Sequence, residues 1–353
     1  MNLRALAEPF AITAAAMLAS MLIFGAFMAA AGVNPFELYH WMYVGGFGTS
    51  FSWQNTLTRA APLILTALCT ALPTRLGLII IGGEGALVLG GLAAVTAGNM
   101  LHNASPIMAL TGMAVAGFVA GGIVIAIAGG LRHYRGVNAT ISSLLLTYIS
   151  IAIFSFLVEG PLRDPASLNK PSTYPIPKEF MLGNMFGMDV HWGLAFSVVA
   201  CVVSYVLMYH TTFGFAATMT GGNVRAAQGA GLPVGRLVLI TCLLAGGCAG
   251  LAGMVEIAAI HGQANASMIA GYGYTGILVS FIARHHPLGI MPAAILFGGL
   301  SASSGLLQRK LNIPDASVQV LMGLIFVMIL LFETGYGRYK MFMARELREA
   351  LTT

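Results

Sequence analysis

The sequence predicts an all-α protein that crosses a membrane about ten times. Hydrophobic residues make up 58% of the 353-residue chain and charged residues only 8%, and the mean hydropathy is +0.84. A soluble globular domain carries about 25% charged residues, so this chain must have lipid as its solvent. Apolar runs that are long enough to span a bilayer recur along the whole chain.

These apolar runs predict the membrane-spanning helices in order. We place them at residues 10–32, 57–73, 77–98, 106–130, 138–158, 192–210, 237–258, 273–283, 288–306 and 317–333. The eighth run is too short to cross a bilayer unless it begins in the glycine-rich segment before it. We expect the helices to form one transmembrane domain over residues 1–353, with breaks near the membrane midplane where glycines interrupt them.

Lysines and arginines in the loops predict which side of the membrane each loop faces. With the N-terminus inside, the inner side holds eleven of the 17 basic residues: Arg4, Arg75, Arg132, Arg135, Arg225, Arg236, Arg284, Arg338, Lys340, Arg345 and Arg348. The outer side holds the other six: Arg59, Arg163, Lys170, Lys178, Arg309 and Lys310. Both termini are therefore expected in the cytoplasm.

Two segments outside the spans have distinct compositions. Residues 159–191 are rich in proline and carry both signs of charge, which predicts a structured outer cap or a docking surface. The C-terminal tail, residues 334–353, mixes basic residues with methionine, phenylalanine and leucine. That mixture predicts a helix lying along the inner membrane surface.

The inner loop at residues 211–236 is too polar and too rich in glycine to span a membrane. Asn223 can cap a short helix that continues through Gln228, and Gly229 and Gly231 would stop it. The loop is therefore expected to present a short helix to the cytoplasm.

Several function classes are excluded by what the sequence does not contain. None of the four lysines, Lys170, Lys178, Lys310 and Lys340, follows a glycine, so the chain has no phosphate-binding loop for ATP. It has no hydrolase motif and no basic patch with interleaved aromatic residues, so we expect no catalysis, metal, cofactor or nucleic acid. Four cysteines, Cys69, Cys201, Cys242 and Cys248, lie in apolar runs and are expected to be free packing residues. Energy for active transport would come from a partner or an ion gradient.

A carboxylate inside an apolar run is the clearest functional signal. In "GLIIIGGEGALVLGG", residues 77–91, Glu84 is flanked by Gly82, Gly83 and Gly85. An ionisable residue inside a span is costly and is by default a candidate functional group. We interpret the stretch as a discontinuous helix whose break faces a solute path, the alternative being that Glu84 pairs with nearby backbone groups.

Four further polar positions are candidates for the same path. Glu256 lies near the end of a span, where its carboxylate either faces the path or snorkels to water. Asn138 begins the fifth span and either caps it or bonds a polar solute, and Tyr148 within that span packs or lines the path. A second glycine-rich break, residues 270–276, carries Tyr274. Breaks in opposite halves of a chain are typical of transporters built from two related halves.

The chain resembles a known family at these residues. It is similar to the permease subunits of ABC importers of the ribose and branched-chain amino-acid superfamily, and within it to the nucleoside group. The resemblance runs from about Asn34 to Gly337. The segments that carry it are "NPFELYHWMYVGGFGTS", "RAAPLILTAL", "GLIIIGGEGALVLGG", "RGVNATISSLLLTYI", "GGNVRAAQGAGLPVGR", "GLAGMVE", "GYGYTGILVSFIARHHPLG" and "LFGGLSAS".

The resemblance implies a set of partners in a bacterial cytoplasmic membrane. A multi-pass permease of this kind pairs with a second, related permease. A separate ATP-binding subunit docks from the cytoplasm, and an extracytoplasmic binding protein delivers the solute. The inner loop would contain the coupling helix that fits a cleft in the ATPase. The residues that match its motif are Asn223, Arg225, Ala226, Ala227 and Gly231.

The chain departs from the nucleoside group at four positions. That group usually has Phe-Asn at the positions of Ile79 and Ile80, often Asn at Thr147, and Glu at Ala139. Thr147 is included in the expected path on this resemblance alone. Polar groups are lost at these positions, so the solute could be a sugar or another small polar molecule instead of a nucleoside.

Two other classes of function remain open from the sequence. An ion-coupled secondary transporter would use Glu84 and Glu256 as proton or sodium sites, and a membrane scaffold would transport nothing. The broken helices disfavour the scaffold, and the inner loop disfavours the secondary transporter, which has no need of a docking helix there.

Overall fold

The computed structural model describes the backbone of residues 3–185 and 187–352, and the side chains of residues 12–185 and 187–335. Within these ranges the chain is helical, with three isolated β-bridges and no strand. It divides into two compact units. Unit 1 comprises Met1–Thr49 and Leu300–Thr353, and unit 2 comprises Ser50–Gly299. The expected single transmembrane domain therefore stays a prediction.

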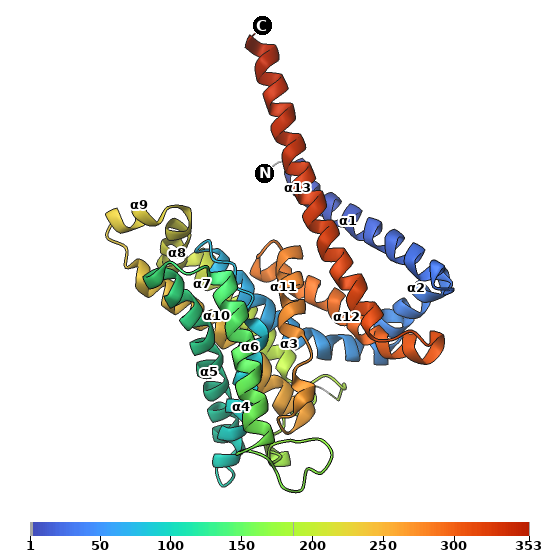
Figure 1. Cartoon of the computed structure of the whole chain (residues 1–353), viewed down its shortest axis with the longest axis vertical. Coiled ribbons are helices and arrows are strands. Elements are labelled where there is room, and N and C mark those ends of the chain that lie inside the picture. Colours follow the sequence, from blue (N-terminus) through green and yellow to red (C-terminus); the bar gives the residue numbers. More distant parts are fainter. Residues whose placement is uncertain (1–2, 186, 353) are drawn as a thin grey trace. The chain divides into compact units, whose positions relative to one another are not determined.

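The helices of unit 2 lie side by side in Figure 1, with α8 and α9 at one end and the loop at residues 160–191 at the other. They are α3 (Ser50–Thr74), α4 (Gly83–Met100), α5 (Pro106–Arg135), α6 (Ala139–Glu159), α7 (Gly193–His210), α8 (Thr212–Gly222), α9 (Val224–Gly229), α10 (Val234–Glu256) and α11 (Tyr272–Ile282). A π-helical turn, Ile257–His261, extends α10, and short 3₁₀ turns lie at Lys178–Phe180 and Ala266–Met268. Helix α12 (Pro287–Leu311) begins in unit 2 and ends in unit 1.

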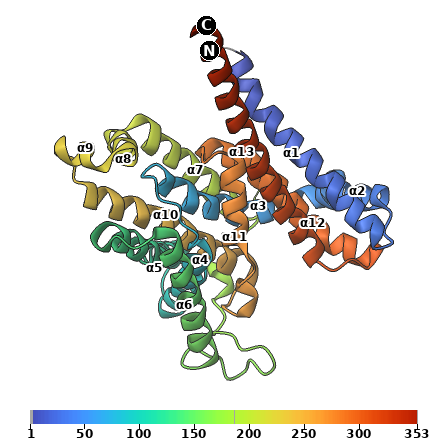
Figure 2. The same ribbon diagram turned by 45° about the horizontal axis from the view of Figure 1, so that its top comes forward.

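Unit 1 consists of α1 (Leu3–Ala30), α2 (Pro35–Tyr43), a π turn at Val44–Gly48, the end of α12, and α13 (Ala316–Thr352). Helices α1 and α13 run alongside each other in Figure 2, where the hydroxyl of Ser20 donates to the carbonyl of Leu324 at 3.5 Å. The predicted tail, residues 334–353, is the end of α13, and its side chains from residue 336 lie outside the described residues.

Eight of the described helices are long and apolar enough to cross a membrane. They span residues 12–30, 50–74, 106–135, 139–159, 193–210, 234–261, 287–311 and 316–335. The prediction of an all-α polytopic membrane protein is confirmed. The predicted spans at 77–98 and 273–283 are not among the eight. Helix α4 begins only at Gly83 and carries Glu84 in its first turn, and α11 has only 11 residues. The count of ten and the orientation of the termini stay predictions.

Glycines bring α4, α5 and α10 into close contact at the centre of unit 2. A Cβ atom at Gly250 on α10 would overlap the carbonyl of Gly117 on α5, and one at Gly90 on α4 would overlap Gly250 itself. Small residues let helix backbones approach this closely, which is how helices gain packing energy where lipid removes the hydrophobic driving force. All four cysteines are buried and free, as expected.

The outer loop at residues 159–191 is bonded to the chain between α10 and α11. The amide of Thr173 donates to the carbonyl of Ala264 at 3.0 Å, and that of Ile176 to the carbonyl of Gly262 at 2.8 Å. Lys170 donates to the hydroxyl of Ser267 at 2.5 Å. The loop is therefore a structured cap fixed to residues 262–267.

We expect Gly250→Ala to destabilise the protein, because its methyl group would meet the backbone of Gly117 rather than a flexible side chain. Overpacking of this kind costs about 1–3 kcal/mol. Gly130→Ala is the matched control, since a Cβ there is 3.5 Å from Leu239, an ordinary contact. Thermal unfolding of the two purified variants should show a lowered Tm for Gly250→Ala alone. Equal Tm values would contradict this account of the helix crossing.

Candidate functional site

Glu84 lies in the first turn of α4, and its side chain is fully buried. One carboxylate oxygen accepts the amide of Gly271 at 2.8 Å, and the other accepts the amide of Gly273 at 2.6 Å. Both donors belong to the second glycine-rich segment, nearly 190 residues away in the chain. Glu84 thus joins the two glycine-rich breaks that the sequence placed in opposite halves.

The carboxylate serves as the cap of α11. The N-cap residue of α11 is Gly271, which has no side chain with which to satisfy the free amides of the first turn. Glu84 from α4 supplies both acceptors. It also sits at the N-terminal end of its own helix, so one negative group lies at the positive ends of two helix dipoles.

The contact needs glycine on the α11 side. A Cβ atom at Gly273 would overlap the backbone of Glu84, whereas one at Gly83 would make an ordinary contact, 3.5 Å from the Cα atom of Gly273. Gly271 has a φ of +81°, a region that residues with a side chain rarely adopt. The glycines therefore let two helix starts meet backbone to backbone, which brings the amides within reach of the carboxylate.

Residues 78–81 run without helix from the turn after α3 to the start of α4. Side chains satisfy their backbone groups. The hydroxyl of Thr140 donates to the carbonyl of Ile79 at 2.8 Å, and the hydroxyl of Ser143 accepts the amide of Ile81 at 3.0 Å. Non-helical backbone at this depth is tolerated because it is covered by protein in this way.

The predicted path residues at α6 differ in whether their polar groups are bonded to the backbone of that helix. Asn138 caps α6, accepting the amides of Thr140 and Ile141 at 2.9 and 3.2 Å. Thr147 is fully buried and donates to the carbonyl of Ser143 at 3.1 Å. Tyr148, by contrast, is 59% exposed.

Tyr274 on α11 lies on the same exposed side as Tyr148. Its side chain is 37% exposed, and the two phenol groups are close enough to interact electrostatically. Glu84 also interacts electrostatically with the phenol group of Tyr274. Tyr148 and Tyr274 are thus both exposed, unlike Glu84 and Thr147.

Glu256 does not snorkel to water, which corrects one of the two sequence-based alternatives. Its side chain is only 3% exposed, because α10 continues as a π-helical turn through His261 instead of ending at the carboxylate. One oxygen lies 3.5 Å from Nε2 of His261, and the other has no partner among the described groups. Glu256 also acts electrostatically on His191, a buried histidine just before α7 whose pKa burial lowers.

The short helix predicted in the inner loop is present. Asn223 accepts the amide of Ala226 at 3.1 Å and caps α9, which runs from Val224 to Gly229. Gly231 follows with a φ of +78°. Ala227 is buried, whereas Arg225 is exposed and makes no ion pair with any described residue. The helix therefore presents a free guanidinium group at its surface.

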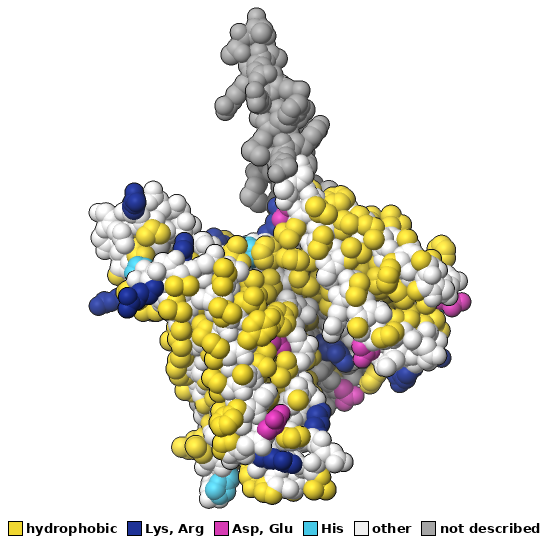
Figure 3. Space-filling model, viewed as in Figure 1, with side chains coloured by type: hydrophobic (Ala, Val, Ile, Leu, Met, Phe, Trp, Pro, Cys, Tyr) yellow, Lys and Arg dark blue, Asp and Glu magenta, His cyan; other side chains and the backbone are white. Residues whose placement is uncertain are grey.

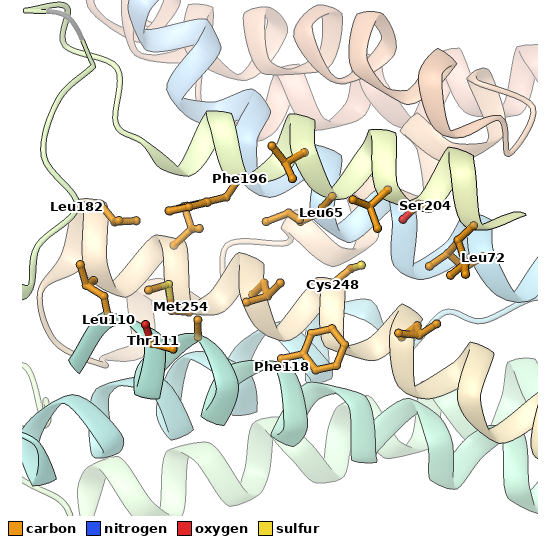
Figure 4. Close-up of a pocket in the computed structure, with 18 residues that line it drawn as sticks. Leu65, Leu72, Leu110, Thr111, Phe118, Leu182, Phe196, Ser204, Cys248 and Met254 are labelled. Carbon is orange, nitrogen blue, oxygen red and sulfur yellow. The ribbon is translucent and has the colours of Figure 1, made fainter. Parts of the chain in front are cut away.

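A cavity of about 500 Å³ lies elsewhere, between α3, α5, α7 and α10 (Figure 4). Leucine, valine, phenylalanine and methionine side chains line it, and its polar groups are limited to Thr111, Ser204 and Cys248. Thr111 already donates to the carbonyl of Ile107 at 2.7 Å. So apolar a cavity offers few groups that could pair the hydroxyl groups of a polar solute.

Sequence reasoning found Glu84 but not its partners. Gly271 and Gly273 were identified as part of a break, not as donors, and Thr140 and Ser143 were not identified at all. A helix start with glycine at its N-cap was the available signal, because such a start needs an acceptor from elsewhere. No sequence signal pointed to His191, whose burial depends on how the outer loop folds.

Comparisons with known proteins agree on one family. The sequence profile described as branched-chain amino acid transport system, permease component, matches residues 52–330. The chain is 32% identical to the glucose ABC transporter permease protein TsgB13 of Haloferax volcanii, over 94% of this chain and 90% of that protein. It is 26% identical to the guanosine ABC transporter permease protein NupP of Bacillus subtilis, over 86% and 87%. It is 25% identical to the nucleoside ABC transporter permease protein NupB of Lactococcus lactis, over 86% and 85%.

We expect Glu84→Gln to lower stability more than Glu256→Gln. Both carboxylate oxygens of Glu84 accept a backbone N–H group. Glutamine has only one acceptor oxygen, so the other backbone N–H group would face the side-chain NH2 group, which is also a donor. An unmet bond to a buried group costs about 2 kcal/mol, or about 5 °C in Tm. Glu256 accepts no backbone amide in the structure, which makes it the matched control. Equal losses in thermal unfolding of the two purified variants would contradict the capping role of Glu84.

Proposed function

The chain belongs to the family of branched-chain amino acid transport system permease components, as the permease subunit of an ABC transporter, and on this premise we propose that it imports nucleosides. Guanosine and nucleoside permeases among the relatives support that substrate class. The capped, exposed helix α9 carries the proposal of ATP-driven import, because it offers a docking element in a chain that has no phosphate-binding loop.

A sugar importer is the second candidate. The glucose permease TsgB13 shares 32% identity with this chain, more than either nucleoside relative described above. The chain also has Thr147 and Ala139 where the nucleoside group has Asn and Glu, which removes groups suited to bonding a nucleobase. A nucleoside and a sugar share a hydroxylated ring, so the same hydroxyl-bonding groups would serve either solute.

The path is proposed along the exposed face that carries Tyr148 and Tyr274. Glu84 lies fully buried behind this face, so it holds the wall of the path instead of touching the solute in this conformation. A second, related permease would supply the opposite wall. Gly82, Gly83 and Gly85 set the position of the wall through their contacts with α6 and α11.

The partners follow from the two ends of unit 2. An ATP-binding subunit would dock on α9 from the cytoplasm, and an extracytoplasmic binding protein would dock on the cap at residues 159–191. The excess of basic residues at the α9 end supports that orientation, with both termini cytoplasmic and about ten membrane passes in a bacterial cytoplasmic membrane. The proposed orientation in the membrane therefore rests on the distribution of basic residues alone.

Ion coupling is disfavoured by the geometry of Glu84. Both carboxylate oxygens are already occupied by backbone amides, and the side chain has no exposure. A proton or sodium site needs a carboxylate that can gain and lose its ligand during transport. Releasing Glu84 would leave two amides of α11 unpaired at each cycle.

Uptake measurements test the proposed substrate. Cells that express the whole importer, with and without this permease, should accumulate radiolabelled guanosine or uridine only when the permease is present. Accumulation of glucose and not of nucleosides would establish the sugar importer instead. Uptake that persists when cellular ATP is depleted but an ion gradient is kept would contradict ATP-driven import.

We expect Arg225→Glu to uncouple the transporter. The guanidinium group is exposed on α9 and unpaired, so it suits an acidic groove on the ATPase, and an anion there would meet like charge. ATP hydrolysis stimulated by the solute-loaded binding protein should fall at least tenfold in reconstituted liposomes. Arg225→Lys, which keeps the positive charge at the same position, is the matched control and should retain the stimulation. Unchanged stimulation in Arg225→Glu would place the coupling contact elsewhere.

A further inference from the structure

A second hollow lies on the outer surface of unit 2, along α5 and the start of α10. It encloses about 460 Å³, and Ile123, Ala126, Ile127, Gly130, Leu131, Tyr134, Arg135 and Leu239 line it. We call it the α5–α10 groove. Apolar side chains form all of it except one end, where Tyr134 and Arg135 stand.

The polar end of the groove is basic. Arg135 is exposed and makes no ion pair with any described residue, and Arg236 is exposed close by. The two helices meet here, because a Cβ atom at Gly235 would lie 3.2 Å from the hydroxyl of Tyr134. Figure 3 shows basic side chains gathered at this end of the molecule, beside a hydrophobic surface that continues along the helices.

The length of the groove matches one leaflet of a bilayer. Arg135 lies twelve residues after Ile123 on α5, which is about 18 Å along the helix at 1.5 Å per residue. Half of a hydrocarbon core is about 15 Å thick. A ligand that fills the groove therefore has an apolar part about as long as an acyl chain and an anionic group at the level of the membrane surface.

We propose that the α5–α10 groove binds an anionic phospholipid of the cytoplasmic leaflet. One acyl chain lies against Ile123, Ile127 and Leu239, and the phosphate group meets Arg135 and Arg236, with the hydroxyl of Tyr134 as a further donor. Basic pockets between spanning helices recognise lipid headgroups in this way. The assignment to the cytoplasmic leaflet rests on the orientation in the proposed function. Lipid binding in the groove does not depend on that orientation.

The other occupants fit less well. A docked ATPase could reach the basic rim, but it could not enter a groove that descends about 18 Å into hydrocarbon. The cavity in Figure 4 is also apolar, yet no charged residue lines it, so nothing there selects a headgroup. Arg135 is what distinguishes the α5–α10 groove.

The site has a consequence for coupling. Gly235 and Arg236 lie in the first turn of α10, directly after the loop that carries α9. A phosphate group bound between α5 and this turn would stabilise the junction between the loop that carries α9 and helix α10. ATPase coupling would then respond to the anionic lipid content of the membrane.

Native mass spectrometry of the full-length chain in detergent tests the proposal directly. The protein is titrated with phosphatidylglycerol or with phosphatidylcholine of the same acyl chains. We expect phosphatidylglycerol to bind at least tenfold more tightly. In the Arg135→Gln, Arg236→Gln double variant this binding should weaken by about 30-fold, since each basic residue near a membrane surface contributes about a factor of five.

Two further variants separate the parts of the site. Gly130→Leu fills the groove without changing charge, because Gly130 lies in its lining with Leu239 in ordinary contact, and it should also weaken binding. Arg163→Gln, on the outer loop, removes one charge far from the groove and should bind like the parent. Inorganic phosphate at millimolar concentration should displace none of the lipid.

Three results would overturn the proposal. Equal affinity for the two lipids, or an unchanged affinity in the arginine double variant, would show that the basic rim selects no headgroup. Unchanged binding in Gly130→Leu would show that the acyl chain lies outside the groove. Displacement by inorganic phosphate would reduce the site to a surface anion site. None of these results depends on which solute the permease carries.

Discussion

One carboxylate at two helix starts is the interaction on which the junction of α4 and α11 depends. A lone acidic group at the centre of a membrane helix costs about 2.5–3.5 kcal/mol on insertion scales. Glu84 offsets that cost by accepting two amides of α11 while lying in the first turn of α4. The same carboxylate also caps α11, because the glycine at the N-cap of that helix has no side chain that could do so.

This contact lies between the cap at residues 159–191 and the non-helical segment at residues 78–81. The cap at residues 159–191 is bonded to residues 262–267, which lead directly into Gly271 and the start of α11. From there the bonds of Glu84 continue to α4 and to the non-helical segment at 78–81, which follows the turn after α3. A partner that moves the outer cap would therefore pull on the same junction that positions Tyr274 and the wall of the proposed path.

The sequence predicted the fold class and the two glycine-rich breaks. Both can be recognised from the composition of short, continuous stretches of the chain. It also predicted the capped helix at Asn223, whose signals lie within a few residues of one another. Two features depend on contacts between distant segments and could not be predicted: the pairing of Glu84 with Gly271 and Gly273, and the burial of Glu256. For Glu256 the sequence left two alternatives open, and the π-helical turn that lengthens α10 beyond the apolar run excludes snorkelling to water.

Hydrogen–deuterium exchange of the full-length chain, compared between the parent and Glu84→Ala, tests the central claim most directly. If the carboxylate holds the start of α11, amides at residues 271–276 should exchange faster by at least tenfold in the variant. The amides of α5 and α10, which pack through glycines away from Glu84, should keep the protection of the parent. Unchanged exchange at residues 271–276 would contradict the account, as would a uniform loss of protection over all helices.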